Sequence, residues 1–423
     1  MKIYFDLYRM LKRFFKNIDK RQAISWALYD FANSSYTVII AWFVFPIYFK
    51  EFVAGGATGD FWRGLAVSVS VLLWALSSPI IWAIADHDQR RKYRFIMFAI
   101  LSMLWSSLLY FVWPWQLAWG LFVFIMANLC FEIAQILYDS FIGQVSSPQT
   151  AGRISGLGYG LWYLGGLVAM LLLQPLYKAG YIAWMETSYM LTFPLTAVFF
   201  LIFSLPSFVF LKDKREAKQH IAFHKLVKIW FQKVWATLKS LKKYKNIAWF
   251  ILGFCLLNDA LVTVLSFVPI YAKTTLHFNM SQIVIMVVLV QVIGFPAAIV
   301  FGWLSDKIWY RKILLWSILG RILITSFLAL GSWMLMMYIV ISITGLVIWS
   351  SQATIRSWYN KIVPAEKRCE FFGFNGFASK AAATIGPLLF GIISVTTGNQ
   401  RIAMAAIVPF FILAIIIFYR LRE

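Results

Sequence analysis

A few charged and amide side chains lie inside long apolar stretches, where each is costly unless it faces a cavity or a partner. Asp259 lies about 13 residues into the stretch at 246–271, a rise of roughly 20 Å in a helix, and Lys380 lies at similar depth in the stretch at 371–394. We predict that they form a buried ion pair. Such a pair is either structural or a coupling element in which protonation of Asp259 releases Lys380, and both roles remain open. The candidates for contact with a substrate or a coupling ion are Tyr29, Asp30, Asn33, Glu132, Gln135, Asn258, Asp259, Asn375 and Lys380.

The sequence shows no pattern of hydrolytic, redox or metal chemistry around these residues. The four histidines and three cysteines have no metal-ligand spacing and form no CxxC pair. Walker A and dinucleotide-binding glycine patterns are missing, and no nucleophile stands at a characteristic spacing from a base. We therefore predict no catalytic residue, metal, cofactor or disulfide, and we expect that the protein is not an enzyme.

The elements that carry the candidate residues are predicted to be membrane-spanning helices. The chain is 61% hydrophobic and only 13% charged, whereas soluble domains carry about 25% charged residues. Apolar runs of about 20 residues recur, and lipid offers no partner for exposed backbone groups, so these runs must be helical. The predicted fold is an all-α membrane protein with twelve spans, at about 24–50, 62–85, 93–112, 115–138, 155–175, 188–210, 246–271, 280–304, 313–331, 333–355, 371–394 and 401–420.

The net charge of +22 is distributed unevenly between the two sides of the predicted membrane. When the N-terminus and the even-numbered connections are assigned to one side, that side holds 32 of the 39 Lys and Arg residues. Positive charge collects in cytoplasmic loops, so both termini are predicted to be cytoplasmic. No separate basic domain is visible, which argues against a nucleic-acid partner.

The chain divides into two groups of six spans, 24–210 and 246–423. Residues 1–23 form a basic amphipathic segment that is predicted to lie on the membrane surface, although a frayed basic tail is an alternative. The connection at 211–245 is a basic linker with its own amphipathic stripe, which indicates a helix on the cytoplasmic leaflet or a docking segment for a soluble partner. A cleavable signal peptide is not recognisable, which favours a bacterial inner membrane.

The two groups of spans are copies of one another. Asp86 and Asp306 each follow a long apolar run, and each precedes a basic pair that begins at Arg91 or Arg311; both offsets are 220 residues. Six plus six spans in parallel orientation, joined by a basic linker, resemble the major facilitator superfamily. That superfamily carries a G-x-L-a-D-r-x-G-r-r loop pattern. Asp86, Arg90 and Arg91 match its first copy and Gly302, Leu304, Asp306 and Arg311 its second, whereas Trp82, Gln89 and Trp309 replace glycines.

The resemblance implies a role for these loops as a cytoplasmic gate. Asp86 would face the start of the span at 371–394, and Asp306 the start of the span at 155–175, because unpaired N–H groups at a helix start favour an anion. Both contacts would hold an outward-open state, although the charges could instead enforce only the topology. The gate candidates are Asp86, Arg90, Arg91, Arg153, Asp306, Arg311 and Arg356.

The first span narrows the resemblance. Residues 25–36, Ser-Trp-Ala-Leu-Tyr-Asp-Phe-Ala-Asn-Ser-Ser-Tyr, are similar to the first-helix signature of the autophagy-related vacuole effluxer family and its bacterial "unknown major facilitator" relatives. Residues 153–158 and 163–166 resemble that family's fifth helix. Residues 138–143, Tyr-Asp-Ser-Phe-Ile-Gly, depart from the family's Tyr-Asn-Ala-Phe-Leu-Pro element. The eukaryotic relatives are associated with amino-acid efflux from vacuoles.

The expected function is secondary active transport of a small organic solute, amino-acid-like, by alternating access in a monomer within the lipid bilayer. The embedded acids suggest protons as the coupling ion. The 20 Trp, 19 Tyr and 39 Phe residues also suit a larger metabolite such as a siderophore or a drug. A non-transporting membrane sensor and a membrane enzyme are remote alternatives. The sequence leaves open the substrate and the direction of transport.

Overall fold

The computed structural model describes residues 19–87, 91–146, 150–177, 188–213, 232, 235, 239–305, 310–331, 334–364 and 368–421, and in these residues all regular secondary structure is helical. Ten helices are long and apolar enough to cross a membrane, and shorter apolar helices at Met280–Gly294 and Met336–Val347 lie where two further spans are expected. The prediction of an all-α membrane fold with twelve spans is confirmed. The predicted surface segment at 1–23 and most of the linker at 211–245 lie outside the described residues.

We number the spans 1 to 12 in chain order. In the first half, span 1 is interrupted, span 3 ends in a short 3-10 turn, and the short helix α7 (Ile142–Val145) joins spans 4 and 5. Spans 1 to 6 are α2 (Lys20–Ser35) with η1 (Tyr36–Phe43), α3 (Val44–Tyr48) and η2 (Phe49–Ala54); α4 (Gly56–His87); α5 (Arg91–Leu108) with η3 (Leu109–Phe111); α6 (Leu117–Asp139); α8 (Ala151–Tyr177); and α9 (Ser188–Phe210).

In the second half, spans 11 and 12 are each built from two helices. Spans 7 to 12 are α11 (Lys245–Thr274); α12 (Met280–Ser305); α13 (Tyr310–Leu330); α14 (Met334–Ile362); α15 (Arg368–Ala382) with α16 (Ile385–Thr397); and α17 (Gln400–Ala405) with α18 (Val408–Arg420).

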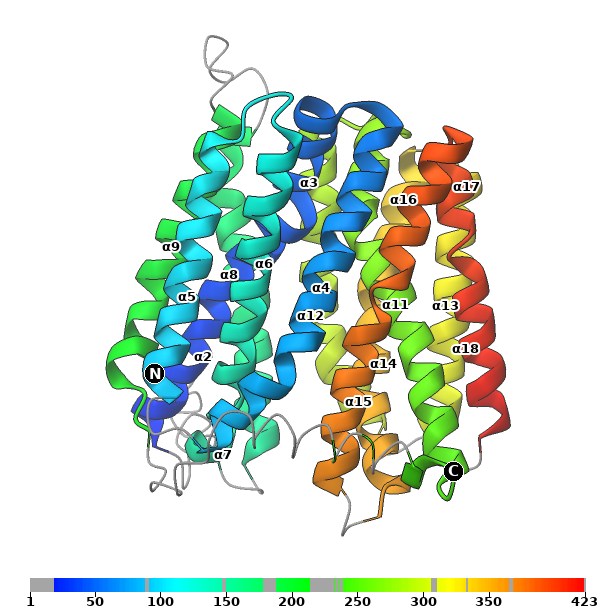
Figure 1. Cartoon of the computed structure of the whole chain (residues 1–423). Coiled ribbons are helices and arrows are strands. Elements are labelled where there is room, and N and C mark those ends of the chain that lie inside the picture. Colours follow the sequence, from blue (N-terminus) through cyan, green and yellow to red (C-terminus); the bar gives the residue numbers. More distant parts are fainter. Residues whose placement is uncertain are drawn as a thin grey trace, which may run out of the picture.

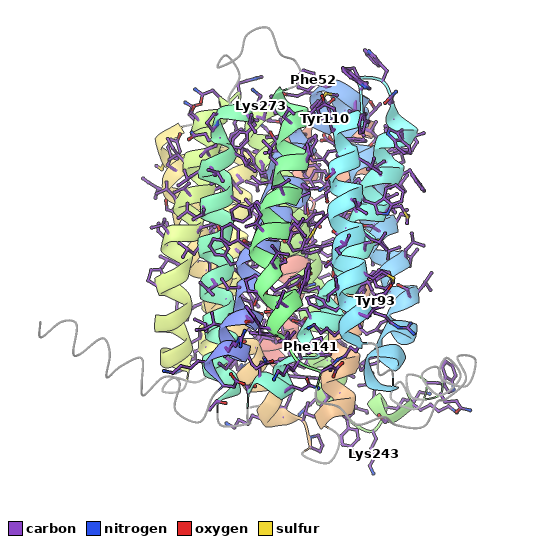
Figure 2. The ribbon with its side chains drawn as sticks, turned by 90° about the vertical axis from the view of Figure 1, so that its left-hand side faces the viewer. Phe52, Tyr93, Tyr110, Phe141, Lys243 and Lys273 are labelled. Carbon is purple, nitrogen blue, oxygen red and sulfur yellow. The ribbon has the colours of Figure 1, made fainter. Side chains whose placement is uncertain are left out.

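The two halves stand side by side with their spans roughly parallel (Figure 1). The first residues of α2 and the last residues of α18 lie at the same end of the bundle, which we call the terminal face, and the opposite end is the distal face. Figure 2 shows Phe52, Tyr110 and Lys273 at the distal face and Lys243 at the terminal face. The charge distribution predicts that the terminal face is cytoplasmic.

The duplication seen in the sequence is also visible in the contacts. The hydroxyl of Tyr48 at the distal end of span 1 donates to the carbonyl of Val112 after span 3, at 2.6 Å. The hydroxyl of Tyr271 at the equivalent place in span 7 donates to the carbonyl of Leu328 in span 9, also at 2.6 Å. The two copies therefore use the same tyrosine to tie their first and third spans together.

Span 1 departs from α-helical geometry in its distal part, where η1 and η2 have the wider π-helical turn. In a π-helix the carbonyl of Ala41 would accept a hydrogen bond from the N–H of residue 46. Residue 46 is a proline and has no N–H, so this carbonyl has no backbone donor. Arg63 of α4 supplies the replacement, because its guanidinium donates to that carbonyl at 2.5 Å while stacking 4.3 Å from the ring centroid of Phe124. The side chain of Arg63 is thereby buried with a partner for one of its nitrogens.

Span 5 approaches span 1 closely through two glycines. A Cβ added at Gly165 would lie 2.0 Å from the carbonyl oxygen of Phe31, and one at Gly158 would lie 2.4 Å from a carboxylate oxygen of Asp30. Small residues let helix backbones pack tightly in lipid. This contact fixes the position of Asp30 inside the first half.

Candidate functional site

An ion pair joins the two halves near the middle of the bundle. Lys380 of α15 contacts the carboxylate of Glu132 of α6, and its Nζ also lies 4.7 Å from the ring centroid of Trp74 in α4. The two side chains remain 41% and 22% exposed, respectively, although both belong to membrane spans. Opposite charges from opposite halves therefore meet on a partly open surface.

The predicted pairing of Asp259 with Lys380 is wrong. The carboxylate of Asp259 instead accepts from the backbone N–H of Gly386, at 2.9 and 3.0 Å from its two oxygens, and the residue is only 2% exposed. Gly386 lies in the first turn of α16, where N–H groups lack partners inside the helix and favour a negative charge. Span 11 is therefore not one continuous helix, and this is the reason why the prediction failed.

The break in span 11 follows from the sequence around residue 384. Pro387 has no N–H to pair with the carbonyl of Ala383, so α15 ends at Ala382 and a new helix starts at Ile385. A Cβ at Gly386 would lie 2.1 Å from the hydroxyl of Thr263, so only glycine fits there. The half-helix α16 thus begins inside the membrane, where its start is capped by a side chain from span 7.

Side chains from both halves bind backbone groups at this break. Asn258 of α11 donates to the carbonyl of Ser379 at 3.1 Å. Ser68 of α4 donates to the carbonyl of Thr384 at 2.6 Å. Discontinuous helices near the bilayer midplane are a common element of transporter binding sites. Asn258 and Asp259 of span 7 thus contact span 11 at Ser379 and Gly386, on either side of Lys380 and the break. Both side chains bind backbone groups of span 11 and do not pair with Lys380.

A second polar cluster lies between spans 1 and 4 inside the first half. Tyr138 donates to the carboxylate of Asp30 at 2.8 Å, and the Asn33 amide donates to Asp30 at 3.3 Å and to Gln135 at 3.1 Å. Gln135 in turn donates to Asp139 at 3.5 Å. The sequence candidates Asp30, Asn33 and Gln135 therefore meet in one network, next to Gly158 of span 5.

The two remaining candidates for substrate contact, Tyr29 and Asn375, are both buried. The ring of Tyr29 is fully buried against Phe95 and Tyr138, with centroid distances of 4.7 and 4.6 Å, inside the first half. Asn375 lies on α15 between its start and Lys380 and is 9% exposed. Neither side chain presents much surface to a solute in this arrangement.

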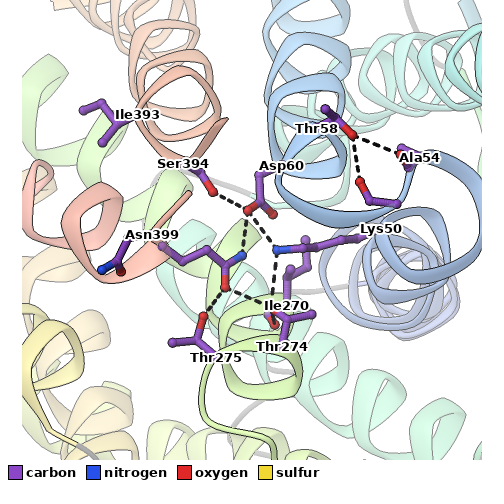
Figure 3. A network of polar contacts seen from close by, with 12 residues as sticks. Lys50, Ala54, Thr58, Asp60, Ile270, Thr274, Thr275, Ile393, Ser394 and Asn399 are labelled. Atoms are coloured by element: carbon purple, nitrogen blue, oxygen red, sulfur yellow. Dashed lines mark hydrogen bonds and ion pairs between the residues drawn. The ribbon is translucent and has the colours of Figure 1, made fainter. Parts of the chain in front are cut away.

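A buried polar network at the distal face was not identified from the sequence (Figure 3). One oxygen of Asp60, in α4, accepts from Lys50 at 2.8 Å, from Ser394 at 2.5 Å and from Gln400 at 2.8 Å. Lys50 and Asp60 belong to the first half, whereas Ser394 and Gln400 belong to the second. Asp60 is fully buried and Lys50 is 6% exposed. We call this network the distal latch.

The distal latch extends to the end of span 7. Lys50 also donates to Thr274 at 3.3 Å, and Thr274 donates to Gln400 at 2.8 Å. Nearby, Glu51 and Lys273 approach to 4.0 Å, with side chains that are about a quarter exposed. The signal in the sequence was the repeated Pro-Ile-Tyr-x-Lys at 46–50 and 269–273, which places a lysine at the distal end of each first span.

Two of the predicted gate residues make contacts within their own half. Arg91 forms an ion pair with Asp213 at 2.8 Å, donates to the carbonyl of Ser140 at 3.1 Å and stacks on Phe141. Arg311 donates to the carbonyl of Tyr419 at the end of span 12. These arginines thus tie the third span of each half to its sixth. The side chains of the other gate candidates lie outside the described residues: Asp86, Arg90, Arg153, Asp306 and Arg356.

Comparison with known proteins agrees with this architecture. A family model described as "Vacuole effluxer Atg22 like" matches residues 64–423. The uncharacterized MFS-type transporter YxiO of Bacillus subtilis is 25% identical, over 96% of this chain and 95% of its own. Autophagy-related protein 22 of Yarrowia lipolytica is 22% identical, over 79% and 71% of the two chains.

Solved transporters share the fold. A point mutant of the nucleoside transporter NupG superposes with a TM-score of 0.68 at 13% identity, over 95% of this chain and 99% of that one. A bacterial homologue of the human lysosomal transporter Spinster, solved in an inward-facing and unoccupied conformation, gives a TM-score of 0.65 at 13% identity, over 94% of this chain and 95% of that one. Since the family model covers most of the chain, the protein belongs to the vacuole effluxer Atg22-like family of major facilitator transporters.

Proposed function

We propose that the protein transports a small zwitterion of the amino-acid type by alternating access, and that Glu132 and Lys380 bind its two charges. The observation that supports this proposal is the partly exposed ion pair between the halves. A substrate carboxylate would take the place of Glu132 on Lys380, and a substrate ammonium would take the place of Lys380 on Glu132. Charge-assisted hydrogen bonds of this kind are the strong ones.

Replacing the Glu132–Lys380 contact by contacts to a zwitterion leaves no charge without a partner. Removing only one member of an ion pair from a low-dielectric site is costly, because the other charge stays behind. A zwitterion offers both charges at once, so it separates Glu132 from Lys380 while each retains a counter-charge. Since these residues belong to different halves, replacing their direct contact by contacts to the substrate would release one tie between the halves.

The distal latch supports a specific state for this arrangement. It closes the distal face with buried contacts between the halves, while Lys380 keeps 41% of its side chain exposed. We infer that the site is accessible from the terminal face. With that face in the cytoplasm of a bacterial inner membrane, as the positive charge predicts, this is the inward-facing state.

Counterflow in proteoliposomes tests the substrate class. Purified full-length protein would be loaded with each of a panel of neutral, acidic and basic amino acids, together with a siderophore and a cationic drug. Neutral amino acids are expected to exchange, and Lys380→Met and Glu132→Gln should each abolish the exchange. Lys273→Met removes a lysine from a second pair between the halves, with Glu51, and should leave exchange within about twofold, because exposed pairs contribute little.

Two results would contradict the proposal. The first is exchange of the siderophore or the drug alone by folded protein. The second is full amino-acid exchange by Lys380→Met or by Glu132→Gln.

A further inference from the structure

A separate apolar pocket lies between the two halves. Its walls come from spans 1 and 5 of the first half and from spans 7 to 10 of the second, and its cavity volume is about 110 Å³. Trp42 and Trp162 form one wall, with their rings edge to face at a centroid distance of 5.9 Å. Val264, Val287 and Val290 of the second half also line the pocket.

One polar side chain in this pocket has no partner. Gln291 of α12 lines the pocket and is only 6% exposed, yet neither its amide nitrogen nor its amide oxygen has a hydrogen-bond partner among the described residues. A buried amide without partners is unfavourable, because it has lost water and gained nothing in exchange. Ordinary core packing therefore does not account for a glutamine at this position.

A glycine on the facing span keeps space open beside this amide. A Cβ added at Gly166 of span 5 would lie 3.1 Å from the side-chain oxygen of Gln291 and 2.9 Å from Val38. The amide therefore stands where spans 5 and 8 approach one another, with a donor and an acceptor available side by side.

We propose that this pocket is a second binding site, and that it takes a neutral molecule with an aromatic or branched apolar body and one group that both donates and accepts a hydrogen bond. A carboxamide, or an alcohol, has that chemistry. The wall residues supply the apolar and aromatic surface, and the Gln291 amide pairs with the polar group. None of the pocket-lining side chains that the structure describes is charged, so an ionised ligand would bury its charge without a partner.

The site is distinct from the proposed zwitterion site. Val264 lies five residues beyond Asp259 on span 7, about 8 Å further towards the distal face. Lys380 lies on the other side of the break in span 11, towards the terminal face. The proposal for the pocket thus does not depend on the proposed function.

Occupancy of the pocket would act on transport. Its walls belong to both halves, so a ligand in it binds the present arrangement and loses its contacts when the halves separate. The expected effect is inhibition of exchange that is not competitive with substrate.

Calorimetric titration of purified full-length protein in detergent tests the pocket, with 3-phenylpropanamide as the probe and the ionised 3-phenylpropanoate as its matched charged analogue. The amide should bind, and the carboxylate should not. Gln291→Met keeps the size and length of the side chain but removes the amide, and it should weaken binding of the probe by about tenfold. Val287→Trp fills the pocket and should abolish binding.

Thermal unfolding of the same variants checks the state of the glutamine. Gln291→Met should unfold at the same temperature as the wild type or higher, because an unpaired buried amide has been removed. A lower unfolding temperature would mean that Gln291 has a structural partner and would overturn the proposal. So would unchanged affinity of the probe for Gln291→Met, equal binding of the carboxylate, or undiminished binding to Val287→Trp, which would show partition into detergent.

Discussion

Replacing Asp60 by asparagine is predicted to open the distal face. The asparagine side chain would have nearly the same shape, but it would leave the ammonium of Lys50 buried without its counter-charge. The carboxylate oxygen that accepts from Lys50, Ser394 and Gln400 would become a weaker, uncharged acceptor or be lost from the network. The distal latch should therefore fail even though the helices themselves are unchanged.

The size of the effect follows from the burial of the pair. Asp60 and Lys50 have side-chain exposures of 0% and 7%, and removing one partner of a buried pair costs about 3–5 kcal/mol. The pair lies within the first half, but Ser394, Gln400 and Thr274 of the second half cover it. Opening the distal face would expose Lys50 to water, so the closed arrangement bears most of this cost. At about 1.4 kcal/mol for each factor of ten, the ratio of closed to open molecules should fall by roughly two to four powers of ten. A population that is almost all closed would become substantially open.

Distance measurement between spin labels reports this change directly. Labels on Thr58→Cys in α4 and Thr396→Cys in α16 lie on opposite halves at the distal face, where both positions are exposed. The three native cysteines would be replaced by alanine. Pulsed electron spectroscopy on the Asp60→Asn protein should then show a second, longer distance that the parent protein lacks or shows weakly.

Glu51→Gln is the matched control. It removes a second acid that contacts the second half at the distal face. The pair of Glu51 with Lys273 has an N–O distance of 4.0 Å and is about a quarter exposed, so its loss should cost about 1 kcal/mol or less. An unchanged distance distribution for Asp60→Asn would refute the reasoning. Equal shifts for both variants would also refute it, because burial would then not be the cause.

Two further predictions concern the framework of the site. Gly158→Ala should destabilise the protein and impair exchange, because its Cβ would lie 2.4 Å from the Asp30 carboxylate. Gly156→Ala is the control: its Cβ would meet nothing within 4 Å, so it should be neutral or stabilising by up to about 1 kcal/mol. If thermal unfolding gave the reverse order of stability, the close packing of spans 1 and 5 would be contradicted. Tyr48→Phe and Tyr271→Phe each remove one 2.6 Å hydrogen bond to a carbonyl, so each should lower the free energy of unfolding by about 1 kcal/mol. Clearly unequal changes in the unfolding temperature would show that the contact is not equivalent in the two halves.

The sequence was sufficient to predict the membrane spans and their duplication. A run of about 20 apolar residues is long enough to cross the bilayer, and it must be helical because lipid offers no partner for its backbone groups. The repeated Tyr48 and Tyr271 were visible as an offset of 223 residues, and their equivalent hydrogen bonds follow from the shared fold. The resemblance to the vacuole effluxer family is likewise confirmed.

The partners of the charged residues were harder to predict. Depth along the sequence placed Asp259 and Lys380 at one level, on the assumption that span 11 is a single helix. Gly386 and Pro387 were the available signal for a break, and a free helix start is a better partner for a carboxylate than a distant lysine. Asp60 was not predicted as a contact between the halves for a different reason. It precedes the predicted start of its span at residue 62, where a charge is usually a solvated end rather than a buried contact.

The break in span 11 has a consequence for the order of events in a transport cycle. Lys380 lies on α15, before the break, and Ser394 of the distal latch lies on α16, after it. A rigid rod would move both residues together, so that opening one face would disturb the other at once. Two segments that meet at residues 383–384 allow α15 to swing while α16 stays attached to Asp60. For the proposed alternating-access cycle, the break thus predicts an occluded intermediate that is closed at both faces around the solute.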